Sequence, residues 1–213
     1  KYDVDKKIVV RYPAGAGGRF LGCLIESIHN KDFKFSFDEY GGVHTFNDAK
    51  ISRNVFHTHK RIVDILFENT DPNIKLVQIT VNADWDIFVL RSYWKKALRP
   101  YMLVDRIDQL TKAIYGWTDT AWAKEQLLKT AWEELDVKFQ QLLKKDLQSQ
   151  PENTKAIHHP RILNITHGDI VFSDLKKVIE SIADFIEVSD YDQNHLTSLL
   201  QQYRDLQPQL KIN

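Results

Sequence analysis

The residues of this chain best suited to chemistry lie near its start, where a glycine cluster and an arginine follow a short apolar run. Gly15, Gly17 and Gly18 would let the backbone close around phosphate or sulfate oxygens, because no Cβ stands in the way. Arg19 adds a forked, charged donor beside them. The sequence therefore predicts an anion site, contacted by Ala14, Gly15, Ala16, Gly17, Gly18, Arg19 and Phe20.

The residues on either side of the glycines predict the elements that position them. The β-branched run at 8–10 is typical of a buried strand, and residues 11–13 end it. From Phe20 to Ile28 the apolar residues recur at helical spacing. A helix that starts here would point its unpaired N–H groups and the positive end of its dipole at the anion. The alternative is a glycine turn that only joins a strand tightly to a helix.

A second group of candidates ends the next predicted strand, residues 54–59. His57 and His59 stand two residues apart, so their side chains would share one side of a strand, and Lys60 follows. Polar groups at the carboxyl end of a parallel strand stand over the crevice where such sheets bind ligands. His57, His59 and Lys60 are therefore candidates for acid/base chemistry and anion binding, with structural histidines as the alternative. No third ligand is near, which disfavours a metal site.

The rest of the chain alternates predicted strands and helices. Strands are expected at 75–81 and 161–166, helices at 60–67, 86–98, 105–147, 175–186 and about 192–206, and loops at 32–48 and 148–153. This alternation predicts an α/β fold with a central parallel sheet covered on both faces, a three-layer α/β/α sandwich.

Several local features refine this outline. Asp84, Thr118-Asp119 and either Ser173 or Asp174 are expected to cap helices, and residues 167–169 to form a turn. The loop at 32–48 is rich in aromatic residues, which would either line an acceptor pocket or plug the loop onto the core. The tryptophans are expected to be core anchors: Trp117, Trp122 and Trp132.

The composition is that of an ordinary globular protein with one sizeable core. The chain has 213 residues and a formal net charge of zero, which favours neither nucleic acid nor a membrane surface as partner. We expect one domain over 1–213, with a helical insertion at about 101–150. The single cysteine, Cys23, fits a reducing, cytoplasmic location, and its place on a helix indicates packing. No apolar run is long enough to span a membrane, and no heptad pattern indicates an oligomeric state.

Taken together, these segments resemble the sulfotransferase family. The family's phosphosulfate loop reads roughly Y-P-K-S-G-T-T-W after the first strand, where this chain has YPAGAGGRF at 12–20. The K-T-H segment that ends the family's next strand is similar to Thr58-His59, with His57 at the lysine position. The later strand, helix and turn resemble residues 161–173, with Gly168-Asp169-Ile170 at the turn.

The resemblance implies a P-loop-type sandwich that transfers a sulfuryl group from 3′-phosphoadenosine 5′-phosphosulfate to a hydroxyl or amine of a small-molecule or carbohydrate acceptor. His59 would be the catalytic base, and His57 or Lys60 would stabilise charge on the bridging oxygen. Backbone N–H groups of the glycine loop and the Arg19 side chain would hold the phosphosulfate. No metal is required.

The chain also departs from the family pattern. The loop lysine is absent, residues 81–83 replace an R-x-P segment, and the C-terminal R-K-G motif is missing. Arg91 and Ser92 are the only pair where displaced 3′-phosphate ligands would sit. These departures favour a second hypothesis, a fold relative without catalysis that binds a phosphorylated ligand or a protein. A nucleotide kinase or hydrolase ranks third, because the loop lacks the G-K-[ST] ending.

Overall fold

A computed structural model of the chain describes most of the sheet, its helices and the C-terminal third. The described residues are 8–13, 16–37, 43–45, 55–58, 73–82, 112, 114–119, 122, 125–126, 129–130, 134–149 and 151–206. Every helix within these ranges falls short of the length and apolarity needed to cross a membrane.

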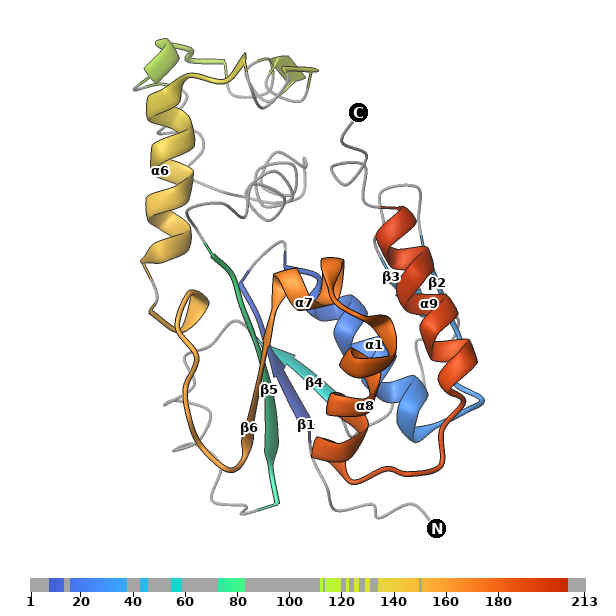
Figure 1. Ribbon diagram of the computed structural model, residues 1–213. Helices are drawn as coiled ribbons and strands as arrows, with labels where there is room; N and C mark the ends of the chain where they lie inside the picture. Colours follow the sequence, from blue (N-terminus) through green and yellow to red (C-terminus); the bar gives the residue numbers. More distant parts are fainter. Residues whose placement is uncertain are drawn as a thin grey trace.

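The described part is a mixed α/β structure around a parallel sheet (Figure 1). Four strands form it: β1 (Ile8–Arg11), β4 (Val55–Thr58), β5 (Lys75–Thr80) and β6 (Ile162–Thr166). Their order is β4-β1-β5-β6, and all neighbours run parallel. The four strands predicted from β-branched runs are thus confirmed, with β1 extended by one residue to Arg11.

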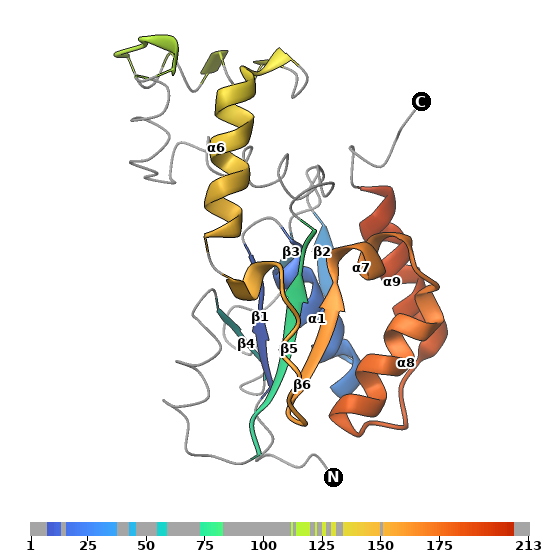
Figure 2. The same ribbon diagram turned by 60° about the vertical axis from the view of Figure 1, so that its left-hand side comes forward.

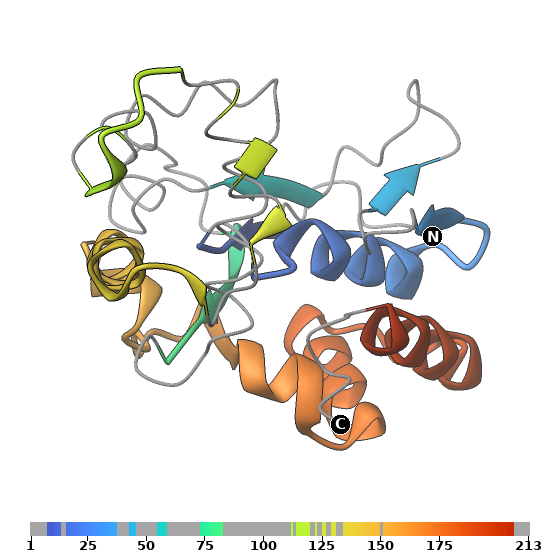
Figure 3. The ribbon, with the colours of Figure 1, turned by 90° about the horizontal axis from the view of Figure 1, so that it is seen from above.

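Three helices build the apolar core on one face of this sheet. They are α1 (Gly18–His29), α8 (Leu175–Ile186) and α9 (Gln193–Asp205), and α9 lies alongside α1 (Figure 3). Helical spacing predicted all three: α8 and α9 each bury one apolar stripe, whereas α1 is buried on nearly every side from Phe20 to Ile28. Residues central to this core are Val10, Leu24, Val77, Ile179 and Leu200.

A different segment covers the opposite face. The helix α6 (Val137–Gln148) ends beyond the carboxyl ends of the strands, and the 3₁₀-helix η2 (Pro151–Asn153) follows it (Figure 2). Residues 151–157, called the covering segment below, hydrogen-bond to β5 and β6 from this side. The predicted helices at 60–67 and 86–98 lie outside the described residues, so a helical layer on this face stays a prediction.

Residues 32–48 contain more order than the expected loop. Two short antiparallel strands, β2 (Phe35–Phe37) and β3 (Val43–Thr45), form a second sheet. Their aromatic rings pack against the core, because Phe35 and Phe37 lie 6.2 and 5.8 Å from the ring of Phe20. The interpretation of these aromatics as a plug on the core is therefore confirmed for Phe35 and Phe37, and the acceptor pocket stays a prediction.

Other expectations need correction. Residues 105–147 are not helical throughout: residues 116–119 are irregular, and Gly116 has a φ of +68°, a left-handed conformation that ends the preceding helical turn. Trp122 is 46% exposed, so it is not a core anchor. The expected turn at 167–169 is instead the start of a short helix, α7 (His167–Phe172), because Thr166 and Asp169 form a capping box.

Two of the predicted helix caps, Asp119 and Asp174, are confirmed, and the third, Asp84, lies outside the described residues. Asp174 accepts hydrogen bonds from the backbone N–H groups of Lys176 and Lys177 at the start of α8. Asp119 accepts one from the backbone N–H of Trp122 at 3.1 Å. Each bond satisfies an N–H group that the first helical turn leaves unpaired.

Candidate functional site

The glycine loop leaves the sheet at the point where open parallel sheets bind ligands. In the strand order β4-β1-β5-β6, the two central strands connect toward opposite edges of the sheet. The chain passes from β1 through α1 to β4 at one edge, and from β5 to β6 at the other edge. Neighbouring strands whose connections diverge in this way leave a crevice outside their carboxyl ends. The described residues of the loop between β1 and α1, 12–13 and 16–17, follow the carboxyl end of β1 at this point of the sheet.

The start of α1 presents backbone N–H groups without a side-chain cap. Gly17 is the N-cap residue, with φ 71° and ψ 18°, and no side chain bonds the cap or places an acidic group in the first turn. The first bond within the helix runs from the Leu21 N–H to the Gly17 carbonyl oxygen at 2.9 Å. The N–H groups of Gly18, Arg19 and Phe20 therefore have no helical partner, which is the arrangement that attracts anions.

The same glycines also permit unusually close packing. A Cβ on Gly17 would collide with the hydroxyl oxygen of Tyr203, and a Cβ on Gly18 would overlap the ring of Tyr12. Tyr203 stacks on Phe20 with ring centroids 4.0 Å apart and planes 2° apart, so it cannot easily move aside. The C-terminal helix α9 thus packs directly against the glycine loop.

The side chains around the loop have distinct environments. Arg19 is exposed, whereas Phe20 is buried and has only its backbone N–H to offer a ligand. Burial raises the pKa of the Tyr12 phenol, and the Arg19 charge partly opposes that rise. Burial likewise raises the pKa of the Cys23 thiol to about 12, which keeps it protonated and confirms its packing role.

The structure brings only some of the predicted site residues together. Ala16, Gly17, Gly18, Arg19 and Phe20 form the described part of the loop. His57 lies in β4 in register with Val10, and the carboxyl ends of β4 and β1 are adjacent, since Thr58 pairs with Arg11. The remaining predicted residues lie outside the described ranges: Ala14, Gly15, His59, Lys60, Arg91 and Ser92.

A buried polar network lies at the carboxyl ends of the central strands, and no sequence pattern predicted it. Arg11 is fully buried, and it donates to the carbonyl oxygen of Glu152 at 2.7 Å and to Oδ1 of Asn153 at 2.6 Å. Gln78 Nε2 donates to the same Glu152 carbonyl at 2.6 Å and to that of Lys155 at 3.0 Å. Burial lowers the pKa of the Arg11 guanidinium, and the Glu152 carboxylate opposes the change.

These bonds fix the covering segment to the carboxyl ends of the central strands. Val81 adds a backbone bond, from its N–H to the carbonyl oxygen of Asn153 at 2.8 Å. For Arg11 the only signal in the sequence was its place at the end of a β-branched run. Because charged residues are normally exposed, that place did not indicate that Arg11 is buried. The sequence predicted the helix α9, but nothing in it indicated that Tyr203 of this helix lies beside Gly17.

Comparison with known proteins does not assign the chain to a family. No protein-family model and no curated protein matches it. Among the described residues, no three His, Cys, Asp or Glu side chains are grouped as metal ligands. The functional interpretation of the site therefore depends on its geometry alone.

Proposed function

We propose that the chain is a sulfotransferase-like enzyme that binds a 5′-phosphosulfate at the start of α1. One observation carries the proposal: an α-helix without a side-chain cap begins directly after a central parallel strand, at the switch point of the sheet. The donor is 3′-phosphoadenosine 5′-phosphosulfate, and the acceptor is a hydroxyl or amine of a small molecule or carbohydrate. The proposed three-layer, P-loop-type sandwich would place both at the carboxyl edge.

The exposed Arg19 side chain would assist the backbone N–H groups of Gly17, Gly18 and Arg19 in holding the phosphosulfate. During transfer the acceptor oxygen or nitrogen bonds to sulfur, and the bond from sulfur to the bridging phosphate oxygen breaks. 3′-Phosphoadenosine 5′-phosphate leaves, and His59 takes the acceptor's proton. His57 or Lys60 stabilises the negative charge on the bridging oxygen, so positioning and charge neutralisation supply most of the catalysis. Arg91 and Ser92 are the candidates for the 3′-phosphate.

A second candidate function is binding of a phosphorylated ligand without transfer. The packing of Tyr203 and Tyr12 against Gly17 and Gly18 favours this second function, because close packing alone explains both glycines without a catalytic role. In this case the loop would bind nucleotide, but no acceptor would be modified.

The experiment is a calorimetric titration with 3′-phosphoadenosine 5′-phosphate and with adenosine 5′-phosphate. We expect tighter binding of the 3′-phosphorylated nucleotide, and a loss of about tenfold in Arg19→Ala, because a charge-assisted hydrogen bond is removed. Lys34→Ala is the matched control: it also removes one exposed cation, but from beyond the C-terminal end of α1, and it should bind normally. Binding of neither nucleotide would contradict the proposal.

A transfer assay separates the two candidate functions. His59→Ala should abolish sulfuryl transfer to a panel of hydroxyl and amine acceptors while nucleotide binding persists. Nucleotide binding without transfer by the unaltered protein would favour the second candidate. Normal turnover by His59→Ala would contradict the role of His59 as base.

A further inference from the structure

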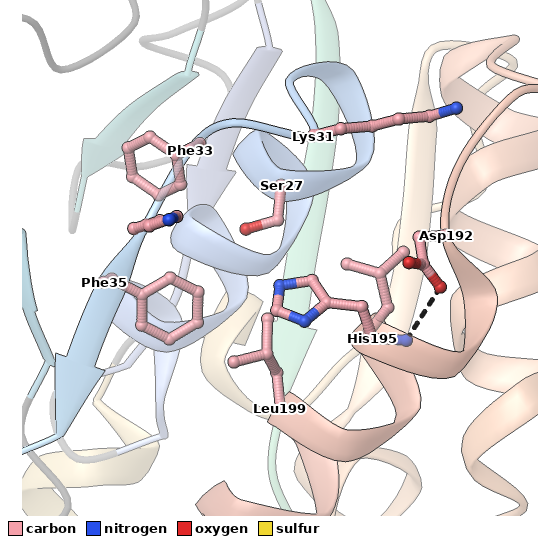
Figure 4. Close-up of a pocket in the computed structure, with 9 residues that line it drawn as sticks. Ser27, Lys31, Phe33, Phe35, Asp192, His195 and Leu199 are labelled. Carbon is pink, nitrogen blue, oxygen red and sulfur yellow. Dashed lines mark hydrogen bonds between the residues drawn. The ribbon is translucent and has the colours of Figure 1, made fainter.

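A pocket of about 440 Å³ lies at the end of α1 that is remote from the glycine loop. It opens between the C-terminal half of α1, the strand β2 and the N-terminal half of α9 (Figure 4). The 12 residues of α1 separate its two ends by about 18 Å, so this pocket is distinct from the proposed anion site. Its volume lies within the range of small-molecule sites.

Two walls of the pocket suit a flat apolar group. Phe33 and Phe35 form one wall, with ring centroids 6.2 Å apart. Leu199 and the ring of His195 form the facing wall on α9 (Figure 4). A planar ring between these walls would contact aromatic surface on both sides, and aromatic contacts of this kind contribute beyond their buried area.

The charges of the lining leave one cation available. Lys31 is already paired with Asp190 at 2.6 Å. The Asp192 carboxylate accepts the backbone N–H of His195 at 3.0 Å and caps α9. Lys34 makes no hydrogen bond or ion pair within the part of the chain that the structure describes. The lining thus carries two ammonium groups, Lys31 and Lys34, against one carboxylate, Asp192, and an anionic ligand group would pair with Lys34.

Two polar side chains would orient a ligand in the pocket. Ser27 Oγ donates to the carbonyl oxygen of Cys23 at 2.9 Å, so toward a ligand it can only accept, which disfavours a carboxylate at its side of the pocket. His195 projects from α9 toward α1, where Ser27 lies (Figure 4). A few polar groups among apolar walls are the usual means by which a pocket orients its ligand.

We propose that this pocket binds a small aryl carboxylate, a ligand unrelated to the sulfuryl donor. The ring lies between the phenylalanine wall and the wall on α9, and the carboxylate pairs with the Lys34 ammonium group. The proposal concerns binding only and does not depend on the proposed enzyme activity.

The test is a titration of the ¹⁵N-labelled full chain with phenylacetate and indole-3-acetate, followed by NMR. We expect backbone amide shifts at 31–35 and 195–199, and a Kd on the order of 1 mM. The neutral amides of the same two acids should bind about fivefold more weakly, because they lose the ion pair.

Two variants sharpen the test. Lys34→Ala should weaken binding of the acids about fivefold and leave binding of the amides unchanged. Phe33→Leu should weaken acids and amides alike, because it replaces an aromatic wall with a smaller aliphatic one. Arg19→Ala is the control at the other end of α1 and should change neither.

Three results would overturn the proposal. The first is equal binding of acids and amides, and the second is acid binding unaffected by Lys34→Ala. The third is concentration-dependent self-association that Lys34→Ala abolishes, which would make the pocket a contact between copies of the chain. A failure of nucleotide binding at the glycine loop would leave the aryl carboxylate result unaffected.

Discussion

The face of the sheet that α1 covers and the face that the covering segment covers are held by different forces. Toward α1, Val10 and Val77 join a continuous apolar core. On the other face an apolar row of Val9, Leu76 and Ile162 comes first, and a polar row follows two residues further along the strands. Its members, in register across β1, β5 and β6, are Arg11, Gln78 and Asn164.

The polar row specifies where the covering segment lies. Asn164 exchanges two hydrogen bonds with the backbone of Ile157, at 2.9 and 3.0 Å, while Arg11 and Gln78 hold Glu152. Apolar contacts have no direction and tolerate small shifts, whereas each of these bonds needs one partner in one place. One face therefore supplies bulk stability, and the other fixes the position of a segment distant in sequence.

The largest expected effect comes from removing the centre of the polar row. Arg11→Met should destabilise the fold by about 3–5 kcal/mol, because the Asn153 side chain loses its charged donor, the Glu152 carbonyl keeps only the bond from Gln78, and the Glu152 carboxylate loses a nearby positive charge. Urea unfolding measures the change. Lys129→Met, on an exposed side chain, is the control and should stay within about 0.5 kcal/mol. If Arg11→Met lost less than about 1 kcal/mol, the hydrogen bonds of the polar row would contribute little to holding the covering segment, and the contrast between the two faces would be wrong.

On the α1 face, the sharpest constraint is steric. Gly17→Ala should cost about 2–3 kcal/mol, since the new methyl group meets Tyr203 and the left-handed backbone becomes strained. In a Tyr203→Phe background the collision with the hydroxyl disappears and a tight contact of 3.1 Å with the ring remains, so a cost of about 1 kcal/mol, mainly from the backbone, should persist. Urea unfolding of the unaltered protein, the two single mutants and the double mutant tests this prediction in a double-mutant cycle. An unchanged cost in the double mutant would contradict close packing of α9 on the loop.

Substitutions at different residues of the polar row should change the free energy of unfolding by different amounts. Gln78→Leu should change stability by no more than about 1 kcal/mol in either direction, although Gln78 is fully buried. Its Oε1 atom has no hydrogen-bond partner among the described residues, and Glu152 keeps its bond from Arg11, so the substitution also removes an unsatisfied group. The same unfolding measurement applies. A loss above about 2 kcal/mol would show that Gln78 holds the segment as strongly as Arg11.

The smallest effect near neutral pH concerns Cys23 on the apolar face. Because its pKa is raised to about 12 in the folded state, the folded protein keeps a proton that the unfolded chain releases above about pH 9. Stability from this group is thus full at pH 7 and falls as pH rises between these two values. Iodoacetamide should alkylate Cys23 in urea but hardly in the native protein. Equal alkylation rates in both states would contradict its burial.

The sequence by itself determined the local elements. Repeating apolar residues predicted β1, β4, β5 and β6, and helical spacing predicted α1, α8 and α9, because burial of one face imposes the period of the element. Asp119 and Asp174 were recognisable as caps, since a cap bonds within three residues of itself. The glycine loop was recognisable as a junction of strand and helix.

The tertiary structure alone decided which distant residues meet. Arg11 and Glu152 are 141 residues apart, and no local pattern pairs them. Tyr203 reaches Gly17 only because α9 packs beside α1, and the strand order β4-β1-β5-β6 follows from crossovers that periodicity does not encode. Local periodicity reports which side of an element is buried, but the partner on that side depends on how the whole chain closes around its core.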